Sequence, residues 1–241
     1  MTSLREVRHI AAWHFGHPTH LFIHIPKNAG VSLRKHPGLQ GRTLPADPYF
    51  LKSRAYVKAL REAMQAAGEH HGYQHARWRD VNPKVTGRLK AFAVLRNPWA
   101  RTVSRWRFGR LAIEQGASPE GYCADTFEGF LEERHIWGNR PFYWHRAIRG
   151  WYPQRDYVTD EAGSMRADVL RLEHLDTDLA AYLGQPPAPR RNSSGKTDYR
   201  SYYTEKTIQI VADWYATDLE TFGFDFDTGA QRGYWTPEGK P

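Results

Sequence analysis

Cysteine is nearly absent from this chain, since Cys123 is the only one in 241 residues. A single cysteine excludes an intrachain disulfide and a zinc site built on cysteines, and it fits a reducing compartment. Long apolar runs are absent too. No segment approaches the ~18 uncharged apolar residues of a membrane helix, and residues 1–15 carry charges where a signal peptide needs an apolar core. The sequence therefore predicts a soluble, cytoplasmic protein without a membrane span.

Basic residues outnumber acidic ones, 34 to 26, which gives a formal net charge of +8. This balance favours an anionic partner such as nucleic acid, a phosphate-rich cofactor or an acidic glycan. No internal repeat or linker divides the 241 residues, and a chain of this length can bury one sizeable core. We therefore predict a single domain over residues 1–241, with a core at 20–226 and peripheral ends at 1–19 and 228–241.

A strand, a tight turn and the start of a helix follow one another at residues 21–33, LFIHIPKNAGVSL. Leu21–Ile25 predicts a strand, and Gly30 predicts a turn whose backbone can approach a phosphate closely because no Cβ intervenes. The N–H groups of the turn, the helix N-terminus and the charge of Lys27 together favour a bound anion. The candidate anion-binding residues are Lys27, Asn28, Ala29, Gly30, Val31 and Ser32.

The order of residues in this loop differs from that of a nucleoside-triphosphate loop. The latter needs G-x-x-x-x-G-K-[ST], with the lysine after the glycines, whereas Lys27 precedes Gly30 and the first glycine is missing. A kinase-like P-loop phosphotransferase, which would require ATP and magnesium, is therefore an alternative that the motif disfavours. A basic nucleotide- or nucleic-acid-binding protein without catalysis is an alternative from another class, and it predicts affinity that falls steeply with salt.

A second junction of a strand and a helix follows at residues 89–106. Leu89–Leu95 is an apolar run typical of a buried parallel strand, and Asn97-Pro98 has the cap and first residue of a helix. Arg96 stands at the strand end and Ser104 two helical turns later, so their side chains can converge on one phosphate. Arg101 on the same helix matches this pattern as well, and its alternative role is to pair with a carboxylate.

The two motifs resemble those of sulfotransferases that use 3′-phosphoadenosine 5′-phosphosulfate (PAPS), in the carbohydrate branch with the heparan and chondroitin 2-O-sulfotransferases. Residues 24–33 resemble the 5′-phosphosulfate loop of that family, and residues 96–106, RNPWARTVSRW, resemble its 3′-phosphate motif. The resemblance implies a P-loop-like sulfotransferase fold and PAPS as co-substrate, with adenosine 3′,5′-bisphosphate (PAP) as product. It also implies in-line sulfuryl transfer to a hydroxyl acceptor, expected to be a glycan or glycoconjugate, without a metal or nucleic acid.

The resemblance also implies roles for single residues. In this family the lysine of the first loop stabilises the bridging oxygen as the nucleotide leaves, which assigns that role to Lys27. Arg96 and Ser104 are expected to hold the 3′-phosphate. Lys196 lies in a polar segment that corresponds to a loop folding over the nucleotide, so it is expected to contact the donor.

A histidine is the expected base, because its pKa lies close to operating pH. Related glycan sulfotransferases carry such a histidine upstream of the 3′-phosphate arginine, and His75 stands there in a Gln-His-Ala segment that resembles Lys-His-Ala. His70 and His71 are the alternatives. Histidine pairs at i, i+4 spacing are present, but without H-E-x-x-H they do not predict a metal site.

The first loop departs from the family at two positions, where Asn28 and Val31 replace threonines. Losing one hydrogen bond to a charged group costs ~1.5–3 kcal/mol, which predicts weaker donor binding or slower turnover.

Residues 137–152 interleave aromatic and basic side chains, which can stack on sugar rings or simply pack a lid. The acceptor and the oligomeric state stay open.

The remaining elements are predicted from periodicity and caps. A third strand is expected at Asp168–Leu172, and the tail after Asp227 is expected to be loose. Helices are expected at Tyr49–Ala67, near 127–135, from 173 to about 183 and at Thr204–Phe222. Together with the two motifs they predict one α/β domain with a central, mainly parallel sheet flanked by helices.

Overall fold

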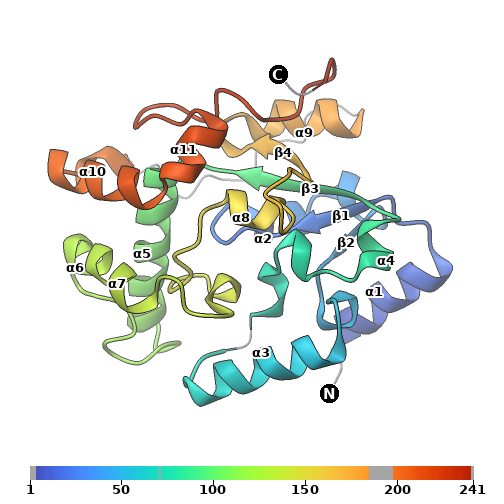
Figure 1. The fold of residues 1–241 in the computed structure, drawn as a ribbon, viewed down its shortest axis with the longest axis horizontal. Helices are drawn as coiled ribbons and strands as arrows, with labels where there is room; N and C mark the ends of the chain where they lie inside the picture. The colour runs from blue at the N-terminus through green and yellow to red at the C-terminus, as the bar shows by residue number, and fades with distance from the viewer. Residues whose placement is uncertain (1–3, 71, 185–197, 240–241) are drawn as a thin grey trace.

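The computed structural model describes residues 4–70, 72–184 and 198–239, which form a four-stranded sheet covered by helices (Figure 1). The strand order is β2-β1-β3-β4, and each neighbouring pair is parallel. The strands are β1 (His20–Ile23), β2 (Thr43–Pro45), β3 (Lys90–Leu95) and β4 (Asp168–Arg171). The predicted α/β class and parallel sheet are confirmed.

β2 is the strand that the sequence did not predict, because its segment is rich in helix and strand breakers. It pairs with β1 at the edge of the sheet, with Phe22 opposite Pro45. A proline is tolerated on an edge strand, where its missing N–H is not needed by a second neighbour. The pairing of a distant strand stabilises β2, so the local sequence carries little signal for it.

β1 and β3 lie in register at the centre of the sheet, with His20 opposite Lys90 and Ile23 opposite Ala93. Parallel neighbours end at the same edge of a sheet, and ligands of open α/β folds bind outside that edge. The loops after Ile23 and Leu95, which carry the two phosphate motifs, therefore leave the sheet side by side. In Figure 1, β3 points toward the side on which α5 and α10 gather.

Alternate strand residues face two cores. Ile23, Ala93 and Val169 face the larger core, whereas Phe22 and Phe92 face a smaller one covered by α9. The helices are α1 (Leu4–Phe15), α2 (Gly30–Arg34), α3 (Arg54–Ala66), α4 (Pro83–Thr86), α5 (Pro98–Glu114), α6 (Phe127–Glu132), α7 (Arg134–Trp137), α8 (Arg155–Val158), α9 (Leu175–Leu183), α10 (Glu205–Trp214) and α11 (Ala216–Phe222).

Several predicted helices have different bounds in the structure, and the one expected near 127–135 is divided at Glu133 into α6 and α7. The helix expected from Tyr49 begins at Arg54, because Ser53 caps it by accepting the N–H of Tyr56, and residues 48–50 form a separate 3₁₀ turn. The helix expected over Thr204–Phe222 is divided at Tyr215 into α10 and α11. The caps at its two outer ends, Thr204 and Gly223, are as predicted.

The chain ends pack onto the domain. In the described part of the tail, which we expected to be loose, the N–H of Trp235 donates to the carbonyl of Val169 at 2.8 Å, and its ring lies edge-on to Tyr182. At the other end, Trp13 of α1 packs edge-on against Phe50. The prediction of a loose tail is therefore wrong for residues 228–239.

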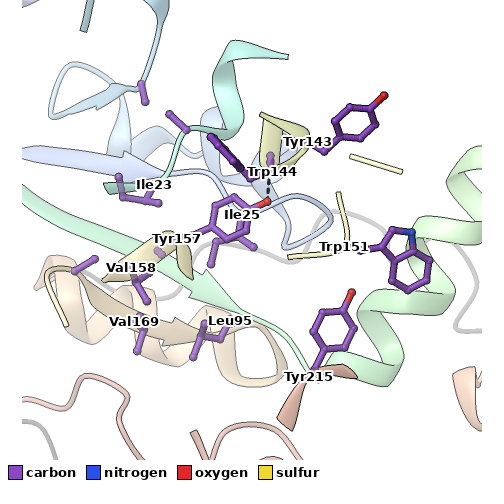
Figure 2. Packing of buried hydrophobic residues seen from close by; sticks show 14 of the residues in the cluster. Ile23, Ile25, Leu95, Tyr143, Trp144, Trp151, Tyr157, Val158, Val169 and Tyr215 are labelled. Carbon is purple, nitrogen blue, oxygen red and sulfur yellow. Dashed lines mark hydrogen bonds between the residues drawn. The ribbon is translucent and has the colours of Figure 1, made fainter. Parts of the chain in front are cut away.

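α8 lies inside the larger core, beside the strand ends. Figure 2 shows Tyr157 and Val158 among Ile25, Leu95 and Val169. The Tyr157 hydroxyl donates to the carbonyl of Trp144 at 2.6 Å, the dashed contact in Figure 2. This packing places the segment before α8 directly against the two motif loops.

In the described part of the chain, no helix has the length and apolar character needed to cross a bilayer.

Candidate functional site

The two motif loops touch. The Nη1 of Arg96, at the end of β3, donates to the carbonyl of Lys27 in the loop after β1, at 3.2 Å. Lys27 and Ala29 adopt left-handed backbone angles, with φ of 67° and 58°. Such angles cost non-glycine residues about 1–3 kcal/mol each and gather at functional sites. The tight turn brings the chain into α2 with the first N–H groups of that helix free of intrahelical partners.

No ion pair within the described part of the chain neutralises the positive charge of this site. Among the described residues, neither Lys27 nor Arg96 forms an ion pair with a carboxylate. Burial, and then the positive charge of Arg96, lower the pKa of Lys27 to about 8. Burial also lowers the pKa of Arg96. At Arg96 the carboxylate of Glu173 opposes this shift and the charge of Arg101 adds to it. A bound anion would stabilise the charged states of both desolvated cations.

The ammonium of Lys27 lies over an aromatic ring. Its Nζ is 3.8 Å from the ring centroid of Phe108, a partly exposed residue of α5. Arg101 and Ser104 precede Phe108 at helical spacing on the same side of α5. The Nε of Arg101 donates to the carbonyl of Pro26 at 3.2 Å. This side of α5 therefore lies along the first loop and brings half-buried Ser104 to it.

Arg101 itself does not do what the sequence indicated. Its guanidinium is buried and donates to the carbonyls of Pro26 and Tyr152, at 3.2 and 3.1 Å, so it braces two backbone segments instead of pairing with a carboxylate. Glu173, which follows β4, also makes a structural contact, because its Oε1 accepts the N–H of Asn97 at 2.7 Å. Asn97 caps α5 as predicted, accepting from Trp99 and Ala100.

The two residues that replace threonines point in opposite directions. Asn28 is 1% exposed, and its Nδ2 donates to the carbonyl of Val94 at 2.7 Å and to Oε1 of Gln154 at 2.6 Å. Val31 is 59% exposed, and Ser32 beside it is exposed as well. Asn28 therefore joins the first loop to the interior, while the hydroxyl available at the surface of the loop comes from Ser32.

Gly30 is needed for a reason that the sequence did not indicate. It is buried, and a Cβ added to it would lie 1.8 Å from Nε2 of His24. The His24 ring in turn lies 4.3 Å from the ring of His75, measured between centroids. The missing side chain therefore makes room for a histidine pair beneath the loop.

We expect Gly30→Ala to lower the free energy of unfolding by about 1–3 kcal/mol, the usual cost of overpacking a filled site. Gly30 has no left-handed φ, so the loss would come from the clash with His24 alone. Denaturant unfolding measures it. Gly87→Ala is the control, because its added Cβ would meet only the Pro83 carbonyl, at 3.1 Å. Equal stabilities of the two variants would contradict the clash.

His75 is held beneath the end of β1. It is 5% exposed in a 3₁₀ turn (Tyr73–His75), and its Nδ1 lies 2.9 Å from the carbonyl of His24. A carbonyl only accepts, so Nδ1 carries the proton and Nε2 keeps its lone pair. Burial foremost lowers the pKa of His75 to about 3, and nearby His145 and Arg34 lower it further. The ring is therefore neutral at physiological pH, and the expectation that the pKa of the base lies close to operating pH is not met by His75 in the unliganded protein.

A hollow of about 270 Å³ opens beside His75 and Phe108. It shares residues His70, Tyr122 and Arg146 with a second hollow of about 320 Å³ that reaches Arg149. Together they form a groove, and one of its lining residues, Phe108, contacts the ammonium of Lys27. Exposed His70, the alternative base, lies on the shared wall, whereas His71 and Lys196 lie outside the described residues.

Two arginines of the groove share one carboxylate. Arg146 and Arg149 lie 2.7 and 2.6 Å from the carboxylate oxygens of Glu69, and Arg149 stacks over Tyr122. Most aromatic residues of segment 137–152, including Trp144, are core residues. Packing therefore accounts for the aromatics of this segment, whereas Arg146 and Arg149 line the groove. Within the described ranges no group of three or more metal-ligating side chains is found.

The structure was compared with known proteins. No family model matches the chain, and no curated protein matches it. Among solved structures, a sulfotransferase from Alicyclobacillus acidocaldarius is similar over 86% of this chain and 97% of that chain, with 19% sequence identity and a TM-score of 0.40. At this low similarity, conclusions about function depend on the residues of the site.

Proposed function

We propose that this protein is a sulfotransferase that transfers the sulfuryl group of PAPS to a hydroxyl acceptor, with a glycan or glycoconjugate as the acceptor class. The observation that carries the proposal is the contact between the two motif loops, in which Arg96 donates to the carbonyl of Lys27 at 3.2 Å. Motifs that resemble the 5′- and 3′-phosphate sites of one family lie 69 residues apart in sequence and adjoin at one edge of the sheet.

The residues present fit an anionic donor. Lys27 and Arg96 form no ion pair with a carboxylate among the described residues, and the pKa of Lys27 is lowered to about 8 by burial and by Arg96. A phosphate or sulfate placed between them would supply the missing negative charge. Ser32 and Ser104 would add hydroxyl donors from α2 and α5.

The proposed reaction needs two contributions from the chain. The acceptor oxygen bonds to sulfur while the bond from sulfur to the bridging phosphate oxygen breaks, with the reacting atoms held in line. Nε2 of His75 takes the hydroxyl proton, and the ammonium of Lys27 stabilises the charge that develops on the bridging oxygen. The groove past Phe108 and Arg146 is the proposed path for the acceptor, which would place its hydroxyl beside His75.

Calorimetric titration tests the donor site. We expect adenosine 3′,5′-bisphosphate to bind without metal and more tightly than ATP with magnesium. Arg96→Ala should weaken the bisphosphate about 10- to 100-fold, because a hydrogen bond to a charged group is worth about 1.5–3 kcal/mol. The control is Lys84→Ala, which removes an equal charge from α4, before β3. Preference for ATP with magnesium would favour the kinase-like alternative.

Activity tests the rest of the proposal. Purified protein with sulfur-labelled PAPS should transfer label to a glycan with free hydroxyls. A nucleic-acid-binding protein would instead bind oligonucleotides in a strongly salt-dependent way and leave labelled PAPS unchanged. Binding of the bisphosphate without transfer to any hydroxyl acceptor would indicate a nucleotide-binding protein and contradict the proposed transferase activity.

A further inference from the structure

One buried amide connects both motif loops. Gln154, the residue before α8, is fully buried. Its Oε1 accepts from Nδ2 of Asn28 at 2.6 Å and from the N–H of Arg96 at 3.0 Å, while its Nε2 donates to the carbonyl of Arg96 at 2.8 Å. The same side chain therefore bonds to the loop after β1 and to both backbone groups of the residue that ends β3.

A buried carboxylate holds this amide in place. Asp218 of α11 is fully buried, and its two oxygens accept the N–H groups of Gln154 and Arg155, each at 2.8 Å. Oδ2 of Asp218 also lies 3.4 Å from Nε2 of Gln154. A flipped amide would face the Asn28 donor with its own NH₂ group and the Arg96 carbonyl with its oxygen. Only one orientation of Gln154 satisfies all of its neighbours.

We infer that Gln154 is a positioning residue that holds the two phosphate-binding loops at the separation required by a nucleotide with two phosphates. The inference rests on the proposed function. The two phosphates of a 3′,5′-bisphosphate are attached to one ribose, so both loops gain contacts only if their spacing matches. The direct contact of Arg96 with Lys27 involves a side chain that a ligand would engage, whereas the Gln154 side chain and its partner Asn28 are buried.

The separation of the loops has a specific readout. Adenosine 5′-monophosphate would contact only the first loop, and adenosine 3′,5′-bisphosphate would contact both. The affinity for the bisphosphate divided by that for the monophosphate therefore measures how strongly the second loop binds the 3′-phosphate. Gln154→Met keeps the volume of the side chain and removes all its side-chain hydrogen bonds. We expect the bisphosphate to lose about 10- to 100-fold in affinity, because displacement of a site by about 1 Å has effects of this size. The monophosphate should change little, so the ratio falls.

Two further variants complete the test. Tyr157→Phe is the control, because it removes another buried hydrogen bond, from Tyr157 to Trp144, without touching either loop. It should lower the melting temperature and leave the affinity ratio unchanged. Asn28→Ala removes the link from Gln154 to the first loop together with the hydrogen bond from Asn28 to the Val94 carbonyl, and it should lower the ratio as Gln154→Met does.

The outcomes separate this inference from the proposed function. If the wild-type protein binds neither nucleotide, the proposed donor site fails, and the inference fails with it. If the wild-type protein prefers the bisphosphate and either Gln154→Met or Asn28→Ala folds with an unchanged ratio, the positioning inference is overturned while the proposed function stands. A lowered ratio in Tyr157→Phe as well would overturn it too, since loss of stability would then explain the effect.

Discussion

Lys27→Ala is expected to lower the turnover of the proposed sulfuryl transfer by about 10²- to 10³-fold, the usual loss when one preorganised donor to developing charge is removed. The Lys27 ammonium lies in the loop after β1, near Arg96, and is partly desolvated. Its positive charge would stabilise the negative charge that develops on the leaving oxygen more strongly than it stabilises the bound donor. Single-turnover transfer from labelled PAPS measures the loss, and bisphosphate binding should weaken by less.

The pKa of Lys27 adds a pH signature to this prediction. Burial, and then Arg96, lower that pKa to about 8, so the ammonium loses its proton as pH rises through that value. We expect the kcat/KM of transfer to be high below about pH 8 and to fall above it. Lys27→Arg keeps its charge over this range and should abolish the alkaline fall. Lys27→Ala with wild-type turnover, or a wild-type profile that is flat to pH 10, would contradict the assignment.

His75→Ala is expected to lower turnover by about 10²- to 10⁴-fold, the range for loss of a general base. The proton on Nδ1 of His75 is held by the His24 carbonyl at 2.9 Å, which leaves Nε2 as the acceptor. Added imidazole should restore part of the rate, because the vacated space adjoins the groove. Steady-state transfer assays with and without imidazole measure both effects.

His70→Ala is the control for this prediction. His70 is exposed on the wall of the groove, whereas His75 is buried and lines the hollow that Phe108 also lines. We expect His70→Ala to keep most of the turnover. The opposite pattern, with His70→Ala inactive and His75→Ala active, would move the base to His70. Because the pKa of His75 is about 3, its protonation should produce no fall of activity in acid down to about pH 5.

The parts of the fold that short-range rules control were predicted well from the sequence. The strand that ends at Leu95, the cap formed by Asn97 and the αL residue Gly223 after α11 are all where the sequence indicates. Each depends on neighbours within about one helical turn, such as a side chain that accepts the first N–H groups of its own helix. The same locality made the loop after β1 recognisable as a candidate anion site.

The limits of elements that depend on distant partners were predicted less well. β2 is stabilised by pairing with β1 in spite of Pro45, and the described tail is held by a hydrogen bond from Trp235 to Val169. The long predicted C-terminal helix is divided at Tyr215, a fully buried residue of the larger core. In each case tertiary contacts decided a conformation for which the local pattern is weak or points elsewhere.

The sequence by itself determined which residues are candidates for the anion site, because Lys27 and Arg96 stand in recognisable strand-to-helix junctions. Only the tertiary structure decided how those candidates are supported. Gly30 makes room for His24, and Gln154 joins Asn28 to Arg96. A buried glutamine 126 residues from its asparagine partner has no periodicity or cap to reveal it. Its contribution exists only once packing has removed water and both ends of its amide must find protein partners.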